Sequence, residues 1–358
     1  MGAYIIKRLL LMIPTLLGVM LLTFLVVQFV PGGPIEQIIA RLENPEAGAD
    51  SRLNGGDENT DTSNSTYQGA KGLDPEFIKK LEIQFGFDKP PHERFLKMLK
   101  DYATFDFGES YFTDKRVIDL IIEKMPVSIS LGLWLMIITY AVSIPLGIRK
   151  AISDGSGFDI WTSAVVIIGY AIPSFIFAII LIVLFAGGSY WDFFPLRGLT
   201  SDNFAELSWF GKLVDYAWHL ALPLTALGIS GFATMTLLTK NSFLDEIRKQ
   251  YVTTARAKGL NERQVLYGHV FRNAMLLVIS GFPGAFLAAF FSGSLLIEHV
   301  FSLDGLGLLS YKSALNRDYP VVFATLFIMT LLGLVVALVS DLIYTMIDPR
   351  IDFDSRET

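Results

Sequence analysis

The stretch YVTTARAKGLNERQVLYGHVFRNA, from Tyr251 to Ala274, is rich in basic residues, contains Ala and Gly, and lies between two long apolar runs. These runs cover Leu220 to Leu238 and Met275 to Ile297. A helix of about 20 apolar residues crosses the roughly 30 Å hydrocarbon core of a bilayer. A charged connection between two such runs is therefore predicted to lie outside the bilayer. We interpret it as a docking helix at the membrane surface and not as part of a pore.

The composition of the whole chain agrees with a membrane protein. Of the 358 residues, 52% are hydrophobic and only 18% are charged, which is too apolar for an ordinary soluble domain. Unpaired backbone groups in lipid cost several kcal/mol each, so the apolar runs must be helices. The sequence predicts an all-α polytopic membrane protein with six transmembrane helices. The six runs are Leu9–Val30, Val127–Ile148, Ile160–Leu184, Leu220–Leu238, Met275–Ile297 and Val321–Tyr344.

The first run has two interpretations, because Lys7 and Arg8 precede it as basic residues precede the core of a secretory signal peptide. The run is longer than the roughly 7 to 15 apolar residues of a signal core. The segment that follows it, Val30 to Pro34, also lacks an A-x-A cleavage pattern. We expect residues 1–30 to be retained as a spanning helix.

The distribution of Lys and Arg predicts the orientation. Basic residues concentrate at the N-terminus, in 149–159, in 239–273 and in the C-terminal tail, and are sparser in 185–218 and 298–320. Short cytoplasmic loops carry this excess, whereas long loops are translocated largely regardless of charge. Both termini are therefore expected to be cytoplasmic. The predicted parts are the first helix (1–30), a periplasmic loop region (31–124), a five-helix core (125–347) containing the cytoplasmic segment 239–273, and a cytoplasmic tail (348–358).

The long outer loop has two parts of different character. Residues 43–72 are rich in Gly, Asn, Asp, Ser and Thr, as expected of a flexible insertion. Asp57, Glu58 and Asp61 raise the alternative of a calcium site, but the alternating acids and distal Glu of a calcium loop are missing. We favour a solvated loop and expect no metal. Apolar residues at helical spacing then predict short helices between Asp74 and Lys100.

Several functional classes are disfavoured by what the sequence lacks. There is no Cys, which excludes disulfides and thiolate metal sites. The net charge of -6, without a compact basic patch, argues against a nucleic-acid partner. No phosphate-binding G-x-x-x-x-G-K-[ST] loop, H-E-x-x-H or G-x-S-x-G motif is present, so we expect no catalytic residues and no bound cofactor. A secondary carrier and a channel stay as alternatives, although no clear internal repeat, charged ring or filter motif supports them.

Local signals predict a helix, a glycine turn and a second helix within the quoted stretch. A helix is expected over Asn241 to Lys258, and Gly259 stands where helices commonly end in left-handed geometry. Asn261 and Gln264 have the spacing of a capping box at the start of the next helix, with Asn in place of the usual Ser or Thr.

The surface of this hairpin has two possible partners. The small residues Ala255, Ala257 and Gly259 leave room for another backbone to approach. Basic side chains offer charge-assisted hydrogen bonds to a protein. These are Arg256, Lys258, Arg263 and Arg272. The alternative is a basic helix that lies on anionic lipid.

Few ionisable residues stand in or near the apolar runs, where charge is costly and often functional. Asp341 lies within the sixth run, and structural pairing or a hydrated interior is favoured over substrate contact. Glu298 lies just beyond the fifth run, where a solvated carboxylate is the alternative to contact with a peptide amine or a binding protein. The prolines of the spans are expected to bend helices or to be tolerated there. They are Pro14, Pro145, Pro173, Pro223 and Pro283.

With these residues in view, the chain resembles the permease subunits of bacterial ABC importers for dipeptides and oligopeptides. The strongest resemblance is YVTTARAKGL (251–260) followed by FRNA (271–274). In the general importer motif Glu-Ala-Ala-x-x-x-Gly, Thr253, Thr254 and Ala255 occupy the first three positions and Gly259 the last. Further similar segments are FGES (107–110), IPLG (144–147), AIPSF (171–175), VFSLDGLG (300–307), NRDYP (316–320) and DPRI (348–351). The N-terminal MGAY and VPGGPIEQ (30–37) are most similar to permeases of importers for microcin C and peptides.

The resemblance implies the type I ABC importer permease fold and a role in the translocation pathway. It implies a second permease subunit, usually a different chain, ATPase subunits that bind ATP and magnesium, and a periplasmic peptide-binding protein. ATP hydrolysis would belong to the ATPase subunits and not to this chain. The residues expected to couple to the ATPase are Tyr251, Thr253, Thr254, Ala255, Arg256, Ala257, Lys258, Gly259 and Leu260.

Overall fold

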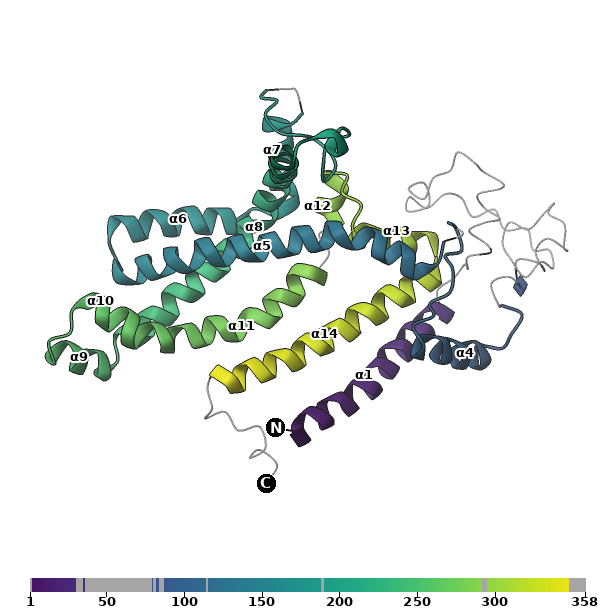
Figure 1. Cartoon of the computed structure of the whole chain (residues 1–358), viewed down its shortest axis with the longest axis horizontal. Coiled ribbons are helices and arrows are strands. Elements are labelled where there is room, and N and C mark those ends of the chain that lie inside the picture. Colours follow the sequence, from purple (N-terminus) through teal and green to yellow (C-terminus); the bar gives the residue numbers. More distant parts are fainter. Residues whose placement is uncertain are drawn as a thin grey trace. The chain divides into compact units, whose positions relative to one another are not determined.

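The computed structural model describes residues 2–29, 35, 79, 82–83, 87–113, 115–187, 190–291 and 295–347. Across these residues the secondary structure is helical, apart from one isolated bridge between Glu109 and Arg116. The predicted all-α class is confirmed. The elements (Figure 1) are α1 (Gly2–Phe29), α4 (Pro91–Ala103), α5 (Val117–Ile152), α6 (Gly157–Ala171), α7 (Ser174–Phe185), η2 (Phe204–Glu206), α8 (Trp209–Ile247), α9 (Gln250–Ala257), α10 (Glu262–Val265), η3 (Leu266–Val270), α11 (Phe271–Phe291), α12 (Leu295–Val300), α13 (Leu306–Asn316) and α14 (Tyr319–Ile347).

Among the described residues, the six predicted spans are matched by five long helices and by one bent pair of helices that makes the sixth if the pair is a single span. Five stretches are long and apolar enough to cross a membrane alone. They are Tyr4–Phe29, Val117–Ile152, Trp209–Ile247, Glu262–Phe286 and Tyr319–Ile343. The sixth is the pair α6 and α7, which are bent by 98° at their junction. The predicted single run Ile160–Leu184 is thus not straight. Pro173 stands at the break, and because proline disfavours helical geometry in the residue before it, Ile172 adopts an extended conformation.

Some predictions from the outer loop and the tail lie outside the described residues. They concern the insertion 43–72, the acids Asp57, Glu58 and Asp61, the helix start at Asp74 and the tail 348–358. Within the described part, the predicted short helix is confirmed by α4, where Phe95 and Leu99 are half-buried.

The chain forms two compact units. The first comprises residues 1–123 and 309–334. Its apolar contacts are largely aromatic. Phe24 of α1 packs against Phe323 of α14, with ring centroids 6.3 Å apart. Phe327, one turn further along α14, packs against Tyr102 and Phe107 in edge-on or tilted geometry.

Two segments that are distant in sequence meet at a buried polar contact in this first unit. Asp318 accepts a hydrogen bond from the Ser110 hydroxyl (2.5 Å) and another from the Tyr111 backbone N–H (3.0 Å). Ser110 and Asp318 are only 4% and 5% exposed. The contact joins FGES (107–110) to NRDYP (316–320) and explains why these polar residues are placed there.

Replacing Ser110 by Ala is expected to lower the thermal stability of the protein. The buried Asp318 carboxylate would lose the Ser110 hydroxyl as a donor and keep the Tyr111 backbone N–H. Leaving a buried polar group without one of its partners costs about 1–3 kcal/mol. Thermal unfolding of the purified protein in detergent measures the loss. Ser110→Thr retains the hydroxyl and serves as the control. An unchanged melting temperature in Ser110→Ala would contradict the prediction.

The second unit comprises residues 124–308 and 335–358. In this unit α8 packs against α6, α7 and α11. One apolar cluster joins α5, α7, α8 and α12, and a second joins α5, α8, α9, α10, η3 and α11. Figure 1 shows α9 and α10 joined by a turn where α8 ends and α11 begins.

Candidate functional site

The segment singled out in the sequence forms a compact helical hairpin after α8. The prediction of one helix over Asn241 to Lys258 is wrong, because α8 ends at Ile247 and α9 starts anew at Gln250. Lys249 between them has extended geometry, with ψ of 151°. Glu246, in the last turn of α8, accepts hydrogen bonds from the Lys249 ammonium (2.5 Å) and the Tyr251 hydroxyl (2.8 Å). These contacts hold α9 at an angle to α8 and stabilise the break.

One side of α9 is anchored in the protein. Val252 and Ala255 are 0% and 6% exposed, and both belong to the apolar cluster that includes Phe243 of α8 and Val270 of η3. Positions three apart share one face of a helix, so both side chains point into this cluster. Ala255 was expected to leave room for a partner, but it faces inward and brings α9 close to its own core. Leu260 is half-buried against the same cluster.

The opposite side of α9 and the turn that follows are open. The exposed residues are Thr253, Thr254, Arg256, Ala257, Lys258 and Gly259. Gly259 has a φ of +85°, the left-handed geometry expected from the sequence. Among the residues that the structure describes, a Cβ built on Gly259 would meet no atom within 4 Å. The tip of the hairpin therefore has space that the described part of the chain does not fill.

The predicted capping box is confirmed. The Asn261 side chain accepts from the Gln264 backbone N–H (2.9 Å), and the Gln264 side chain accepts from the Asn261 backbone N–H (3.1 Å). Two backbone donors at the start of α10 are satisfied in this way. The turn at Gly259 is thus fixed on both sides, by α9 before it and by this cap after it.

Replacing Asn261 by Ala is expected to destabilise the hairpin by about 1 kcal/mol, the usual cost of losing an N-terminal cap. Hydrogen exchange of the α10 backbone N–H groups measures this change locally, and faster exchange is expected there. Asn261→Ser retains a capping oxygen and should exchange nearly as the wild type does. Equal protection in Asn261→Ala and the wild type would refute the role of the cap.

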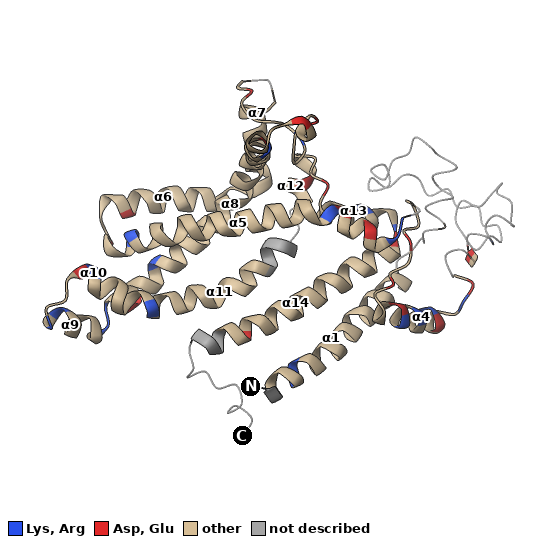
Figure 2. Ribbon diagram, in the orientation of Figure 1, with Lys and Arg blue, Asp and Glu red and all other residues tan. Residues whose placement is uncertain are grey.

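Charged residues surround the hairpin (Figure 2). Arg256 forms a two-point contact with the Glu262 carboxylate, at 2.8 and 2.9 Å. The Glu262 carboxylate raises the pKa of the Arg256 guanidinium. Arg256 is therefore already paired within the hairpin, although the pair is exposed and a partner carboxylate can compete for it. Lys258 and Arg263 are exposed as expected. Burial raises the pKa of the Tyr251 hydroxyl, so it donates to Glu246 as a neutral phenol.

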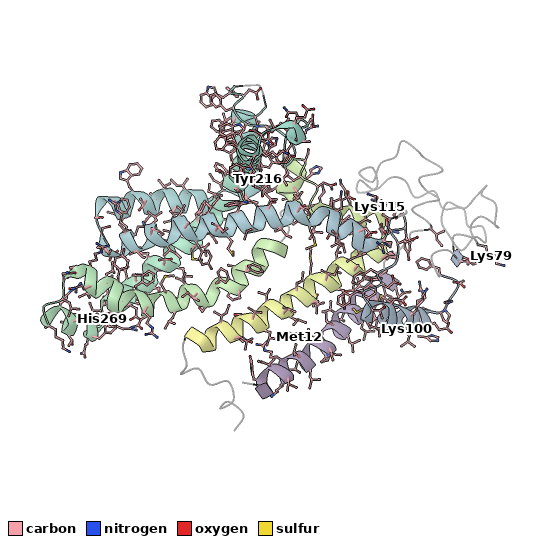
Figure 3. All side chains as sticks on the ribbon, viewed as in Figure 1. Met12, Lys79, Lys100, Lys115, Tyr216 and His269 are labelled. Atoms are coloured by element: carbon pink, nitrogen blue, oxygen red, sulfur yellow. The ribbon has the colours of Figure 1, made fainter. Side chains whose placement is uncertain are left out.

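The sequence did not predict the π-helical turn η3 between α10 and α11. It covers Leu266–Val270, with Val270 buried and His269 exposed. Figure 3 shows His269 at this end of the protein. A wider turn rotates the helix that follows it, and such turns are frequent at functional sites. No spacing in the sequence distinguishes it from an ordinary α-helical turn.

Glu298 is buried, so the expectation of a solvated carboxylate is wrong. Its side chain is 1% exposed and accepts from the Leu308 backbone N–H at 2.7 Å. The backbone N–H of Gly307 also donates to it. A Cβ on Gly305 would lie 2.7 Å from the Glu298 carboxyl carbon, so only glycine fits there. The carboxylate holds the loop between α12 and α13 in place.

This loop has further supports. Two residues of α5 contact it. The Ser128 hydroxyl accepts from the Leu306 backbone N–H (2.9 Å), and Lys124 pairs with Asp304 (2.5 Å). Asp341, the second acid of the apolar runs, lies in α14 and is half-buried. Glu298 and Asp341 thus occupy separate elements, α12 and α14.

The spans and the hairpin that connects two of them make this chain a polytopic helical membrane protein. Residues 143–353 match the family described as the binding-protein-dependent transport system inner membrane component. The chain belongs to this family. It is a multi-pass inner-membrane permease subunit, a translocation component and not an enzyme, and ATP hydrolysis lies in partner subunits.

Relatives over the full length support the assignment. The chain is 67% identical to the peptidoglycan transport system permease protein YejB of Agrobacterium fabrum, covering all of both chains. It is 58% identical to the inner membrane ABC transporter permease protein YejB of Escherichia coli O157:H7, over 99% of this chain and all of that protein. It is 33% identical to the oligopeptide permease AppB of Bacillus subtilis, with the same coverage.

Among solved structures, the MetNI methionine ABC transporter in an inward-facing conformation is similar to this chain with a TM-score of 0.47 and 14% identity. The match covers 64% of this chain and 97% of that one.

Proposed function

We propose that this permease forms part of the translocation pathway for peptides or peptide-like compounds such as microcin C. The names of the full-length relatives support this substrate class, because they refer to peptidoglycan and oligopeptide transport. We propose also that α9 and the Gly259 turn couple the permease to its ATPase subunits. The observation that carries this role is the two-sided character of α9. One face is buried in the core, and the other is exposed, with open space at Gly259.

A buried anchor and an open face are what a coupling element requires. A partner that presses on the open face displaces Val252 and Ala255, and these contact the cluster formed by α8 and α11. Both long helices would then move between inward-open and outward-open arrangements. ATP binding must favour one arrangement over the other, because equal affinity for both shifts nothing.

The proposed assembly contains a second permease, expected to be a different chain, ATPase subunits with bound ATP and magnesium, and a periplasmic peptide-binding protein. Both termini and the hairpin would be cytoplasmic, as the basic residues of the short loops indicate. In this orientation Glu298 positions a loop near the outer entrance. We assign Asp341 a structural or pathway role near the cytoplasmic end of α14.

Purification from native membranes in mild detergent tests the proposal. Co-purified chains are identified by mass spectrometry, and ATPase activity is measured with and without the periplasmic binding protein. Recovery of a second permease and an ATPase whose activity the binding protein stimulates would support the importer. A chain that transports alone, driven by an ion gradient, would establish a secondary carrier instead.

The role of the hairpin surface is tested in the same material. If the hairpin binds anionic lipid and not the ATPase, its protection from hydrogen exchange will depend on anionic lipid in the vesicles and will not change when the ATPase is removed. Protection that depends on the ATPase supports the coupling role.

A further inference from the structure

A cluster of charged side chains lies beside the apolar cluster that anchors α9, where α5 ends and α6 begins. At its centre is Lys150 of α5, whose side chain is 0% exposed. Its ammonium donates to the Asp159 carbonyl (2.9 Å), the Thr162 hydroxyl (2.7 Å) and the Ser163 hydroxyl (2.8 Å). The Asp159 carboxylate lies 3.0 Å away. Lys150 therefore ties the end of α5 to the first turns of α6.

The Asp159 carboxylate is shared with a second lysine, from α8. Lys240 lies 2.7 Å from the other Asp159 oxygen and 2.9 Å from Asp154, in the turn between α5 and α6. The two lysines and two aspartates balance in formal charge. A buried charge that loses its partner is strongly destabilising, so such groups hold their geometry. Lys240 therefore links α8 to the α5–α6 hairpin through two carboxylates.

The network continues to the start of the coupling element. Arg248, the residue that follows α8, lies 3.6 Å from Asp154. The Arg248 and Asp154 side chains are 71% and 40% exposed, whereas that of Lys240 is 14% exposed. Exposed pairs are weak, and buried pairs resist separation. The ion pairs therefore resist separation more strongly toward Lys150 than at the α8–α9 junction.

A close backbone contact supports the same link. Gly147 of α5 faces Thr239 of α8, and a Cβ on Gly147 would lie 2.6 Å from the Thr239 Cβ. Thr239 is fully buried. This contact lies about one turn from Lys150 and next to Lys240. Packing and charge thus join α5 and α8 at one place, and this explains the glycine of IPLG (144–147).

We propose that Lys240 is a positioning residue that makes the α5–α6 hairpin follow the cytoplasmic end of α8 when the transporter changes conformation. The proposal rests on the coupling role assigned to α9 above. Force applied to α9 enters α8 at Arg248. The exposed contact between Arg248 and Asp154 yields, while Lys240 carries the displacement to Asp159 and hence to α6. The ends of α5, α6 and α8 then move as one body.

Lys240→Met removes the ion pairs between α8 and the two aspartates and leaves the contact between Lys150 and Asp159 intact. Met keeps the apolar stem of lysine, and Lys150 and Asp159 stay paired within the α5–α6 hairpin. In the assembled transporter in proteoliposomes, the fold-stimulation of ATPase activity by the periplasmic binding protein is expected to fall about fivefold or more, the lower range of ordinary coupling between sites. A simple packing role would not alter this stimulation in a correctly assembled transporter.

Spin labels report the motion directly, and the absence of Cys in the chain provides a clean background. Labels are introduced by Trp161→Cys on α6 and Asp245→Cys on α8, at two exposed positions. In the otherwise wild-type transporter the distance between them should be the same without nucleotide and with ATP under conditions that block hydrolysis. In Lys240→Met the distance should change between these states.

Matched variants complete the test. Lys240→Arg retains the positive charge and should restore both readouts, and Lys212→Met, at the other end of α8, should resemble the wild type. If Lys240→Met fails to assemble, Asp154→Asn weakens the same link from an exposed position and should reduce the stimulation. If the binding protein stimulates the wild type, and Lys240→Met equals the wild type in ATPase stimulation and in label distance, the role of Lys240 is refuted and the proposed function stands. A wild type that shows no stimulation overturns the proposed function as well.

Discussion

Replacing Gly259 by Trp is expected to lower peptide uptake by at least about tenfold, equivalent to ~1.4 kcal/mol, while the permease stays inserted and able to receive the loaded binding protein. The reason is steric. A Cβ at Gly259 meets no atom of the described residues within 4 Å, so the indole is expected to extend into the space proposed for the ATPase subunit. Uptake of a labelled peptide by cells, at equal permease abundance in the membrane, measures the effect.

Two controls separate this clash from backbone strain. Gly259 has a φ of +85°, which costs a residue with a side chain roughly 1–2 kcal/mol, except that Asn tolerates it better. Gly259→Asn should therefore retain most of the uptake. Gly268→Trp adds the same bulk at another open position of the same segment, on η3. Unimpaired uptake in Gly259→Trp at normal expression would refute the docking role of the turn.

The Glu298→Ala change is expected to have the largest effect on stability, a loss of about 2–5 kcal/mol. Two backbone N–H groups, of Gly307 and Leu308, would lose their acceptor in a buried site, and each unsatisfied buried group costs about 1–3 kcal/mol. The removed side chain also leaves a cavity. Thermal unfolding in detergent measures the loss, and uptake should fall with it because the loop between α12 and α13 would no longer be held.

Asp304 supplies the matched control in the same loop. Like Glu298 it is an acid, and it pairs with Lys124, whose side chain is 16% exposed, but the Asp304 side chain itself is 54% exposed. Because a partly exposed carboxylate can be replaced by water at its partner, Asp304→Ala should lose less stability than Glu298→Ala. Glu298→Gln keeps the shape and one acceptor oxygen and should fall between the two. A melting temperature of Glu298→Ala equal to that of Asp304→Ala would show that the buried carboxylate does not support the loop.

Much of this protein could be predicted from the sequence because the signals are local. The length and hydropathy of an apolar run decide whether it can span a bilayer. The left-handed Gly259 and the cap formed by Asn261 and Gln264 involve only residues a few positions apart, and both were predicted correctly. Orientation, the coupling role of the hairpin and the substrate stay predictions, because they depend on a membrane or on other chains.

The errors concern residues whose surroundings come from distant parts of the chain. The helical pattern over Asn241–Lys258 shows no break, since the break depends on Glu246 holding Tyr251 while Val252 packs into the core. A small residue such as Ala255 suits both a partner surface and a tightly packed core, so its residue type does not reveal that it faces inward.

The sequence by itself determined the class of protein, the number of spans and the local form of the hairpin, because these follow from hydropathy and from hydrogen bonds between near neighbours. Only the tertiary structure decided that Glu298 is a buried support for a loop and that one carboxylate, Asp159, joins the lysines of α5 and α8. The physical reason is that the energy of a buried charge depends on which groups surround it. Those partners are brought together by packing and not by their order in the chain.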